Sequence, residues 1–423
     1  MRFLKFIYIK ISRKLKEIPF IKKILIFFAI MGPGIITANV DNDAGGITTY
    51  SIAGTDFGYT LLWTLIPIMF ALILIQEMCN RMGVVTGKGL SDLIREKFGI
   101  KITFYLMLLI LLTNFGNIIA EFAGIAASME IFGFKKNIAV PISAFIVWYM
   151  VVKGTYKSVE KIFLFACFFY ISYIITGFLV KPSWTQITKE IMYPKINFNT
   201  DYLMMFIGLV GTTIAPWMQF YQQASVAEKG IKLQEYKYSK FDTIIGGIVV
   251  NIIAFFIIVV CAKVLFENGQ KISTASDAAV ALKPLAGPYC SYLFAFGLLN
   301  ASLFAASILP LSTAYSVCES FGWETGINKN FSEAPQFYIL YSLLIFIGAG
   351  IILFPKISLI KIMWISQFIN GLVLPFVLFS ILLIINDKKI MGEYVNSKFS
   401  NILSVICIAV MSILSLMFVI SLF

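Results

Sequence analysis

Long apolar stretches separated by short polar segments fill most of the chain. About 20 consecutive apolar residues form a helix that crosses the roughly 30 Å hydrocarbon layer of a membrane. Eleven stretches approach or exceed this length: 24–54, 59–80, 102–132, 138–152, 162–180, 201–227, 242–266, 289–321, 336–355, 359–386 and 399–422. The pattern therefore predicts an all-α polytopic membrane protein.

Two of these stretches are interrupted by polar or helix-breaking residues. NVDNDAGG (residues 39–46) lies in the first stretch, and Pro216 lies within GLVGTTIAPWMQFYQQ in the sixth. Adjacent glycines, short polar side chains and a proline all disfavour a continuous helix. Irregular backbone at membrane depth persists only where protein buries it or where it lines a wet cavity. Spans one and six are equivalent positions of two five-helix halves, which indicates an inverted-repeat transporter with two broken helices.

This reading divides the chain into five segments. They are a basic cytoplasmic arm (1–23), a first five-helix repeat (24–180), an extracellular linker (181–200), a second, inverted repeat (201–386), and a loop with an eleventh transmembrane helix (387–423).

Composition and charge fix the class of protein and its orientation. Hydrophobic residues make up 59% of the chain and charged residues 13%, which excludes a water-soluble domain of this size. With the N-terminus in the cytoplasm, 24 of the 34 Lys and Arg residues fall on the inner side. Since basic loops stay in the cytoplasm, we expect a multi-pass protein of the cell membrane with its C-terminus outside. The net charge of +12 then reflects topology and the lipid bilayer, and not nucleic acid.

The residue inventory excludes some chemistry and favours a hard cation. The chain has no histidine, and its six cysteines form no CxxC pair, so a zinc site or a histidine proton relay is excluded. Asp43 is a carboxylate at the first break, and carbonyl oxygens of Val40, Thr212 and Ala215 are expected at the half-helix ends. Gln367 in the tenth span adds an amide oxygen. Such oxygen ligands suit Mg²⁺, Ca²⁺ or Mn²⁺.

Other interpretations of these residues stay open at this stage. Asp41 and Asp43 could be helix caps, and Gln367 could make only a helix-to-helix hydrogen bond. Asp41 and Asp43 could also form an aspartyl pair of a membrane hydrolase, although they are two residues apart on one segment and no GxSxG or HExxH motif is present. A pore-type channel and a sodium-coupled carrier of an organic solute are further alternatives.

Several segments resemble the NRAMP family of divalent-metal transporters. They are MGPGIITANVDNDAGGITTYSIAGTDFGYTLLW, RMGVVTGKGLSDLIREKFG and SQFINGLVLPFVLFSILLIINDKKIMGEY, together with Pro216. The resemblance implies a LeuT-type fold of five plus five helices, alternating access and, in typical members, proton-coupled uptake of Mn²⁺ or Fe²⁺. It implies that no enzymatic activity and no resident cofactor are present.

The departures from the family pattern concern its ligands and its proton path. Counted from Pro33, the family's metal-binding Asp falls on Asp43, and its Asn ligand falls on Gly46. The family's Met-Pro-His in the sixth span becomes Ala215, Pro216 and Trp217.

In the third span the family's inner carboxylate is kept as Glu121, but the acidic position one turn earlier is Ile118. The ninth span, FYILYSLLIFIGAGII, lacks the family's arginines. We expect Asp41, Asn42, Glu121 and Trp217 to support the site or line the pathway.

This combination resembles the NRAMP-related magnesium transporters. The resemblance implies transport of Mg²⁺ and Mn²⁺ without proton coupling, and the ordinary proton-coupled symporter remains the alternative. Small residues at the Gly46 and Ala215 positions leave room for an ion that keeps part of its water, as Mg²⁺ prefers to do. The sequence indicates no protein partner.

Overall fold

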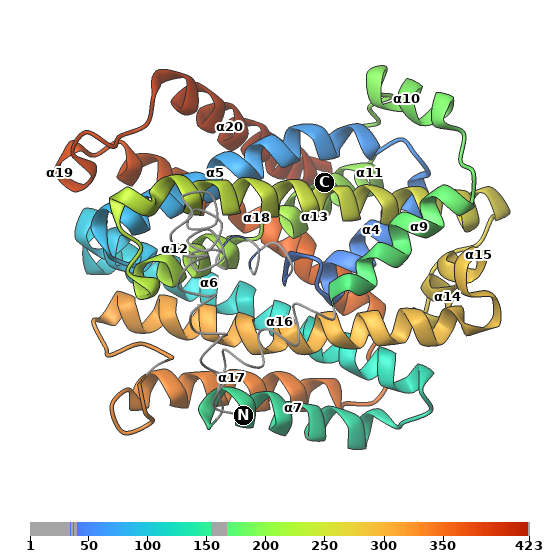
Figure 1. The fold of residues 1–423 in the computed structure, drawn as a ribbon, viewed down its shortest axis with the longest axis horizontal. Helices are drawn as coiled ribbons and strands as arrows, with labels where there is room; N and C mark the ends of the chain where they lie inside the picture. The colour runs from blue at the N-terminus through green and yellow to red at the C-terminus, as the bar shows by residue number, and fades with distance from the viewer. Residues whose placement is uncertain (1–33, 35–36, 38–39, 154–166, 328, 422–423) are drawn as a thin grey trace, which may run out of the picture.

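The computed structural model describes residues 34, 37, 40–153, 167–327 and 329–421, and Figure 1 shows their arrangement. The described part contains helices and no strand. This confirms the expected all-α class. The predicted basic arm, 1–23, lies outside the described residues.

The first half of the chain contains eight described helices. They are α4 (Ala44–Phe57), η1 (Leu62–Thr64), α5 (Leu65–Thr86), α6 (Leu90–Ile131), α7 (Lys136–Val152), η2 (Cys167–Tyr170), α9 (Ile171–Leu179) and α10 (Trp184–Met192). The last of these, α10, lies within the segment expected to be an extracellular linker.

The second half begins with a broken pair and ends with an added helix. Its long helices are α11 (Thr200–Thr213), α12 (Pro216–Lys229), α13 (Tyr236–Val264), α16 (Cys290–Phe321), α17 (Pro335–Ile352), α18 (Leu359–Ile385) and α20 (Lys398–Ser421). Short helices connect them: η3 (Leu233–Glu235), η4 (Phe266–Asn268), α14 (Ala275–Ala279), η5 (Val280–Leu282), α15 (Lys283–Ala286), η6 (Gly287–Tyr289) and α19 (Lys388–Met391).

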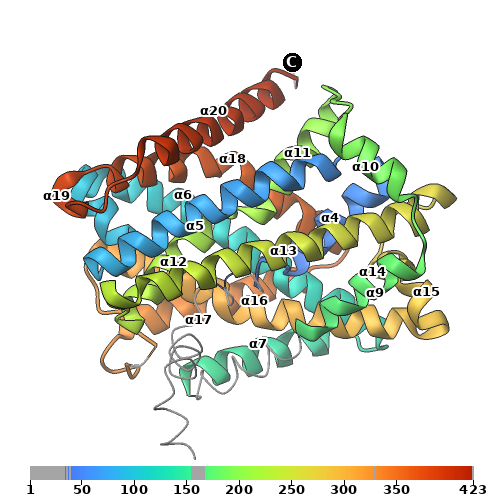
Figure 2. The same ribbon diagram turned by 45° about the horizontal axis from the view of Figure 1, so that its top comes forward.

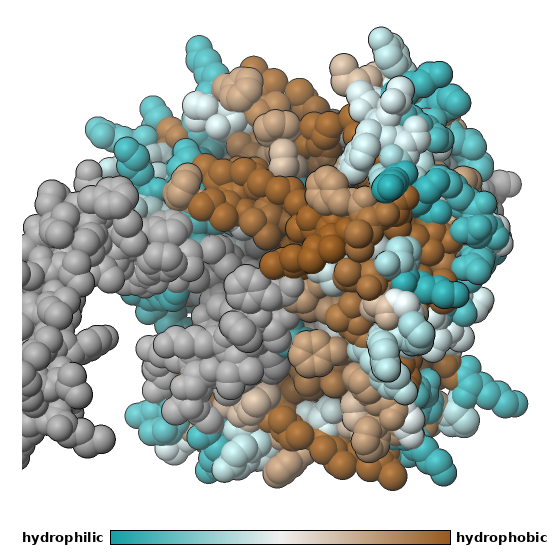
Figure 3. Space-filling model, turned by 45° about the vertical axis from the view of Figure 1, so that its right-hand side comes forward, coloured by the Kyte–Doolittle hydropathy of each residue, from teal (hydrophilic) through white to brown (hydrophobic). Residues whose placement is uncertain are grey.

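The membrane-spanning character of these helices is clear from their length and surface. Eight helical segments of the described chain are long and apolar enough to cross a membrane, and Lys136–Val152 is a shorter apolar helix. Large hydrophobic side chains such as Phe70, Leu112, Phe145 and Phe376 are more than half exposed, as expected for contact with lipid. Figure 3 shows hydrophobic side chains gathered across the middle of one face. The first and fifth predicted spans are described only in part.

The third span begins earlier than the apolar pattern predicts. The helical segment starts at Leu90, ahead of the expected 102, and Gly99 breaks it with a φ of 76° and a ψ of 170°. Glycine tolerates this positive φ without steric cost, so Gly99 separates a short helix that begins at Leu90 from the apolar helix that follows.

The core packs around α4 and α6. Helix α6 contacts α16, α18 and α17, while α4 lies against α13, α18 and α11. Figures 1 and 2 show α20 at one edge of the bundle, where it packs on α18 and α11. Helix α20 is therefore an addition to the outside of the repeat.

Helices α11 and α18 cross closely, and this crossing positions the tenth span, α18, next to the breaks. A Cβ atom on Gly211 of α11 would lie 2.1 Å from the Gln367 carbonyl oxygen, and one on Gly371 of α18 would lie 2.3 Å from the Ile207 oxygen. Only residues without side chains allow this approach of two backbones. The crossing places Gln367 beside the residues of both breaks.

Candidate functional site: two broken helices around a buried carboxyl pair

The first break occupies two residues. Residues 34, 37, 40 and 41 are helical, Asn42 and Asp43 are not, and α4 begins at Ala44. Asp43 has extended backbone angles and caps α4, since its Oδ1 accepts a 2.7 Å hydrogen bond from the Gly46 amide. Its side chain is only 3% exposed. The cap fixes the direction of the carboxylate but does not neutralise it.

Asp43 lies next to a second buried acid from another span. The carboxyl groups of Asp43 and Glu121 interact directly, and Glu121 is 0% exposed on α6. The Ala44 amide, which would donate to Val40 in a continuous helix, donates instead to Glu121 Oε2 at 3.3 Å. The Val40 carbonyl is thereby released from that helical bond. Two buried carboxyl groups in contact cannot both stay ionised without a cation or proton between them.

At the second break the Thr212 carbonyl loses its helical donor, whereas the Ala215 carbonyl accepts hydrogen bonds. Helix α11 ends at Thr213, Ile214 and Ala215 are not helical, and Pro216 begins α12. Pro216 has no N–H to donate to the Thr212 carbonyl. The Ala215 carbonyl accepts hydrogen bonds from the Met218 amide at 3.2 Å and from Gln219 Nε2 at 3.4 Å. Thr212 therefore offers the less engaged oxygen.

Oxygens from both breaks lie around Gly46. A Cβ atom there would lie 2.5 Å from the Asp41 carbonyl oxygen, 3.3 Å from Thr212 Oγ1 and 3.5 Å from Asp43 Oδ1. The absence of a side chain at this position allows the three oxygens to approach one another this closely. Thr212 contributes its side chain here, whereas the sequence analysis had considered only its backbone.

Gln367 reaches the first break from α18. Its Nε2 faces Gly45, where a Cβ atom would be only 1.8 Å away, and this nitrogen has no hydrogen-bond partner among the described residues. Its Oε1 accepts a 2.8 Å hydrogen bond from Asn370, which also pairs with Asn117 of α6. The amide oxygen is thus engaged in a helix-to-helix network, and a ligand role for Gln367 remains a prediction.

The other two predicted residues, Asn42 and Trp217, make hydrogen bonds that hold the breaks in place. The Asn42 carbonyl accepts a 2.5 Å hydrogen bond from the Tyr170 hydroxyl, and the Trp217 carbonyl accepts one of 3.0 Å from Ser312. Trp217 is buried, at 1% exposure. These bonds attach the first non-helical segment to η2 and the first turn of α12 to α16, so both breaks are held by neighbouring helices.

Sequence reasoning missed several polar residues of this region. Tyr50 and Thr213 share a 2.8 Å hydroxyl contact between α4 and α11, and Asn117 and Asn370 join α6 to α18. A polar residue inside an apolar span was the available signal for each of them. The sequence does not tell which of many such residues meet, because that depends on the crossing of helices distant in the chain.

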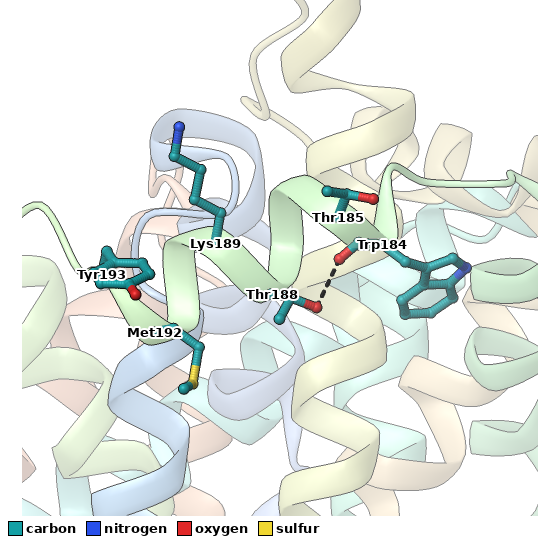
Figure 4. Close-up of a pocket in the computed structure, with 6 residues that line it drawn as sticks. All are labelled: Trp184, Thr185, Thr188, Lys189, Met192 and Tyr193. Atoms are coloured by element: carbon teal, nitrogen blue, oxygen red, sulfur yellow. Dashed lines mark hydrogen bonds between the residues drawn. The ribbon is translucent and has the colours of Figure 1, made fainter.

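A hollow on the surface is unrelated to the breaks. It has a volume of about 490 Å³ and is lined by residues of α10 and its end. Figure 4 shows its labelled side chains on that one helix, with Lys189 pointing away into the open. A lysine beside an open depression does not suit a cation, and none of the predicted site residues lines it.

The comparisons with known proteins agree with this architecture. The family described as "Natural resistance-associated macrophage protein-like" (Nramp) matches residues 34–421. The divalent metal cation transporter MntH of Bacillus subtilis (strain 168) is 24% identical over 392 residues, covering 88% of each chain. MntH of Caldanaerobacter subterraneus is also 24% identical, over 92% of each chain.

Solved structures show the same fold. A manganese transporter of Eremococcus coleocola superposes with a TM-score of 0.72 at 21% identity, covering 93% of this chain and 86% of the other. The transporter Mhp1 in its inward-facing conformation gives a TM-score of 0.57 at 15% identity, covering 93% and 88%. These likenesses show the fold, a LeuT-type helical bundle with the two broken helices expected from the sequence.

The chain belongs to the Nramp family, because the family match spans most of its length. The members of this family are transporters and not enzymes.

Proposed function

We propose that this protein transports Mg²⁺ and Mn²⁺ across the cell membrane by alternating access, without coupling to protons. The observation that carries the proposal is the set of three oxygens around Gly46, from Asp41, Asp43 and Thr212, which brings the two breaks together. Its MntH relatives are named as transporters of divalent metal cations.

The chemistry of the site supports a hard and partly hydrated ion. The groups around Gly46 are carboxylate, carbonyl and hydroxyl oxygens. Mg²⁺ prefers oxygen ligands and dehydrates reluctantly, so it usually keeps several waters. Ala215 supplies no thioether at the second break, which removes a preference for softer metals.

The apolar packing near the third span supports uncoupled transport. A Cβ atom on Gly348 of α17 would lie 3.0 Å from Ile118 and 3.7 Å from Phe122. Helix α17 carries no charged residue along Pro335–Ile352. Along α17 the described chain offers no carboxylate, lysine or arginine that could relay a proton from Glu121. A divalent ion entering a negative cell gains about 4.6 kcal/mol per 100 mV, which is sufficient to drive uptake.

Proton-coupled symport of Mn²⁺ or Fe²⁺ is the second candidate, and one contact favours it. Asp43 touches Glu121, so a metal ion arriving at Asp43 could displace a proton shared by the two acids. Uncoupled transport requires that any proton released from Asp43 and Glu121 return to these two acids from the same side of the membrane.

One experiment in proteoliposomes tests both candidates. Uptake of Mg²⁺ and Mn²⁺ is recorded under an inside-negative potential with a pH dye in the lumen. We expect uptake of both ions without acidification of the lumen, whereas acidification that follows metal uptake would establish symport. Asp43→Ala should abolish uptake, and Asp56→Asn, an exposed acid on the same helix, is the matched control.

A further inference from the structure

Asp41 is a buried acid whose charge the described structure leaves uncompensated. It is the last helical residue before the first break and is 2% exposed. Neither of its carboxylate oxygens has a hydrogen-bond partner among the described residues. A buried carboxylate without donors is costly, so a group beyond the described residues is needed to complete its surroundings.

Asp41 interacts with a group of hydroxyls on α4 and α11 through Tyr50. Asp41 interacts electrostatically with Tyr50, and Tyr50 also contacts Thr212 and Thr213. We call Tyr50, Thr212 and Thr213 the hydroxyl cluster. Thr212 Oγ1 is a further buried oxygen without a partner in the described part of the chain.

The hydrogen-bond directions leave Tyr50 and Thr213 of this cluster with acceptor lone pairs only. The Thr213 hydroxyl donates its proton to the Leu209 carbonyl at 2.9 Å. In the 2.8 Å contact between Tyr50 and Thr213, Tyr50 must therefore be the donor. Tyr50 then has only lone pairs left, so it cannot donate to Asp41.

Oxygens of Asp41, Thr212 and Asp43 lie together around Gly46, and the Asp41 carboxylate interacts electrostatically with that of Asp43. The position of a Cβ on Gly46 is 2.5 Å from the Asp41 carbonyl and 3.3 Å from Thr212 Oγ1, and it is also 3.5 Å from Asp43 Oδ1. The Asp43 carboxylate and Thr212 of the hydroxyl cluster therefore flank the same glycine. Water molecules bound to a metal ion are strong donors with a positive charge behind them, which is what such a set of oxygens requires.

We propose that Asp41, with Tyr50 and Thr212, is an outer-sphere site that accepts hydrogen bonds from water molecules retained by the transported ion and so selects hydrated Mg²⁺. This inference rests on the function proposed above. Asp43 contacts the ion directly, whereas Asp41 accepts hydrogen bonds from the water molecules of its hydration shell. A residue of this kind favours Mg²⁺, which holds its water, over an ion that gives it up more readily.

The test compares two ions in one variant. Asp41→Asn keeps the shape of the side chain and removes its charge. We expect the apparent affinity for Mg²⁺ in proteoliposome uptake to fall at least tenfold, and that for Mn²⁺ to fall less than threefold. Equal losses for both ions would make Asp41 a direct ligand and overturn the proposal, as would no loss for either.

A second probe isolates outer-sphere binding. Hexaamminecobalt(III) carries six inert ammonia ligands, so it offers N–H donors and no open coordination position. We expect it to inhibit Mg²⁺ uptake by the wild-type protein and to do so at least tenfold more weakly in Asp41→Asn. Unchanged inhibition in the variant would contradict the proposal.

Controls separate this inference from the proposed function and from misfolding. Thr212→Val, which removes one acceptor without changing the charge, should lower Mg²⁺ affinity more than Mn²⁺ affinity, and it decides the question if Asp41→Asn does not fold. Asp56→Asn should change neither affinity. A wild-type protein that moves Mn²⁺ but no Mg²⁺ would overturn both proposals, whereas an unaltered Mg²⁺ to Mn²⁺ ratio in Asp41→Asn overturns this one alone.

Discussion

Gly45 of α4 and Gln367 of α18 are in direct contact, because a Cβ atom on Gly45 would lie 1.8 Å from Nε2 and 2.9 Å from Cγ of Gln367. The contact joins the first broken span to the tenth span. It depends on the absence of a side chain at position 45, and it leads to a first prediction.

Gly45→Ala is expected to destabilise the protein by about 1–3 kcal/mol, the range for overpacked core positions. Gln367 would have to change rotamer and lose its bond to Asn370. Thermal unfolding of the purified protein measures the effect. In the double variant Gly45→Ala with Gln367→Ala the two losses should not add, because the second substitution removes the clash. Additive losses would show that the contact is not the cause.

Asp43 has two roles that substitutions can separate. Asparagine caps helices about as well as aspartate, whereas alanine at a cap costs about 1 kcal/mol. In metal-free buffer we expect Asp43→Asn to be at least as stable as the wild type, since it also removes repulsion by Glu121. Asp43→Ala should be less stable than Asp43→Asn, and both should lose metal uptake. Metal uptake by Asp43→Asn would exclude an essential charge at this position.

Ala215 tests the importance of a soft ligand at the second break. Ala215→Met should shift the preference from Mg²⁺ toward Mn²⁺ and Cd²⁺ by about tenfold, because a thioether favours softer metals. Ion competition during uptake measures the shift. Ala215→Leu adds similar bulk without sulfur and should reduce transport without this change in preference. If both variants shift the preference equally, volume and not sulfur is responsible.

Tyr315 connects three elements at one end of the bundle. Its hydroxyl donates to the Glu228 carboxylate of α12 and accepts a 3.0 Å hydrogen bond from the Ile327 amide. Tyr315→Phe removes both contacts and should cost about 1–3 kcal/mol.

We expect trypsin to cleave faster after Lys329, which follows Ile327 in the α16–α17 connection. Tyr289→Phe, at an exposed tyrosine outside these contacts, should not change the cleavage rate. An unaltered rate in Tyr315→Phe would contradict a role of this hydroxyl in holding the connection.

The helices and the two breaks were predictable because their causes are local. Pro216 cannot continue a helical hydrogen-bond pattern, and Asp43 before two glycines favours a cap and a new helix start. Membrane-spanning helices also reveal their length through continuous apolar sequence. The extra helical region from Leu90 was missed because its mixed polarity does not satisfy that criterion.

The partners of the polar residues were not predictable in the same way. Gln367 was expected to present an oxygen to a metal ion, but its oxygen accepts a bond from Asn370 and its nitrogen faces Gly45. The pairing of Asn117 with Asn370 joins residues 253 positions apart. Such contacts depend on how helices cross, and no local pattern encodes the crossing of α6 with α18.

By itself, the sequence determined an all-helical membrane protein with two interrupted spans, a carboxylate at the first break and small residues at two expected ligand positions. The tertiary structure decided that Asp43 meets Glu121, that Thr212 contributes a side-chain oxygen, and that Asp41 is buried without a hydrogen-bond partner among the described residues. The physical reason is the range of the forces involved. Apolar length and helix breaking act within one segment, whereas the balance of donors and charges in a buried site is set only when distant spans pack together.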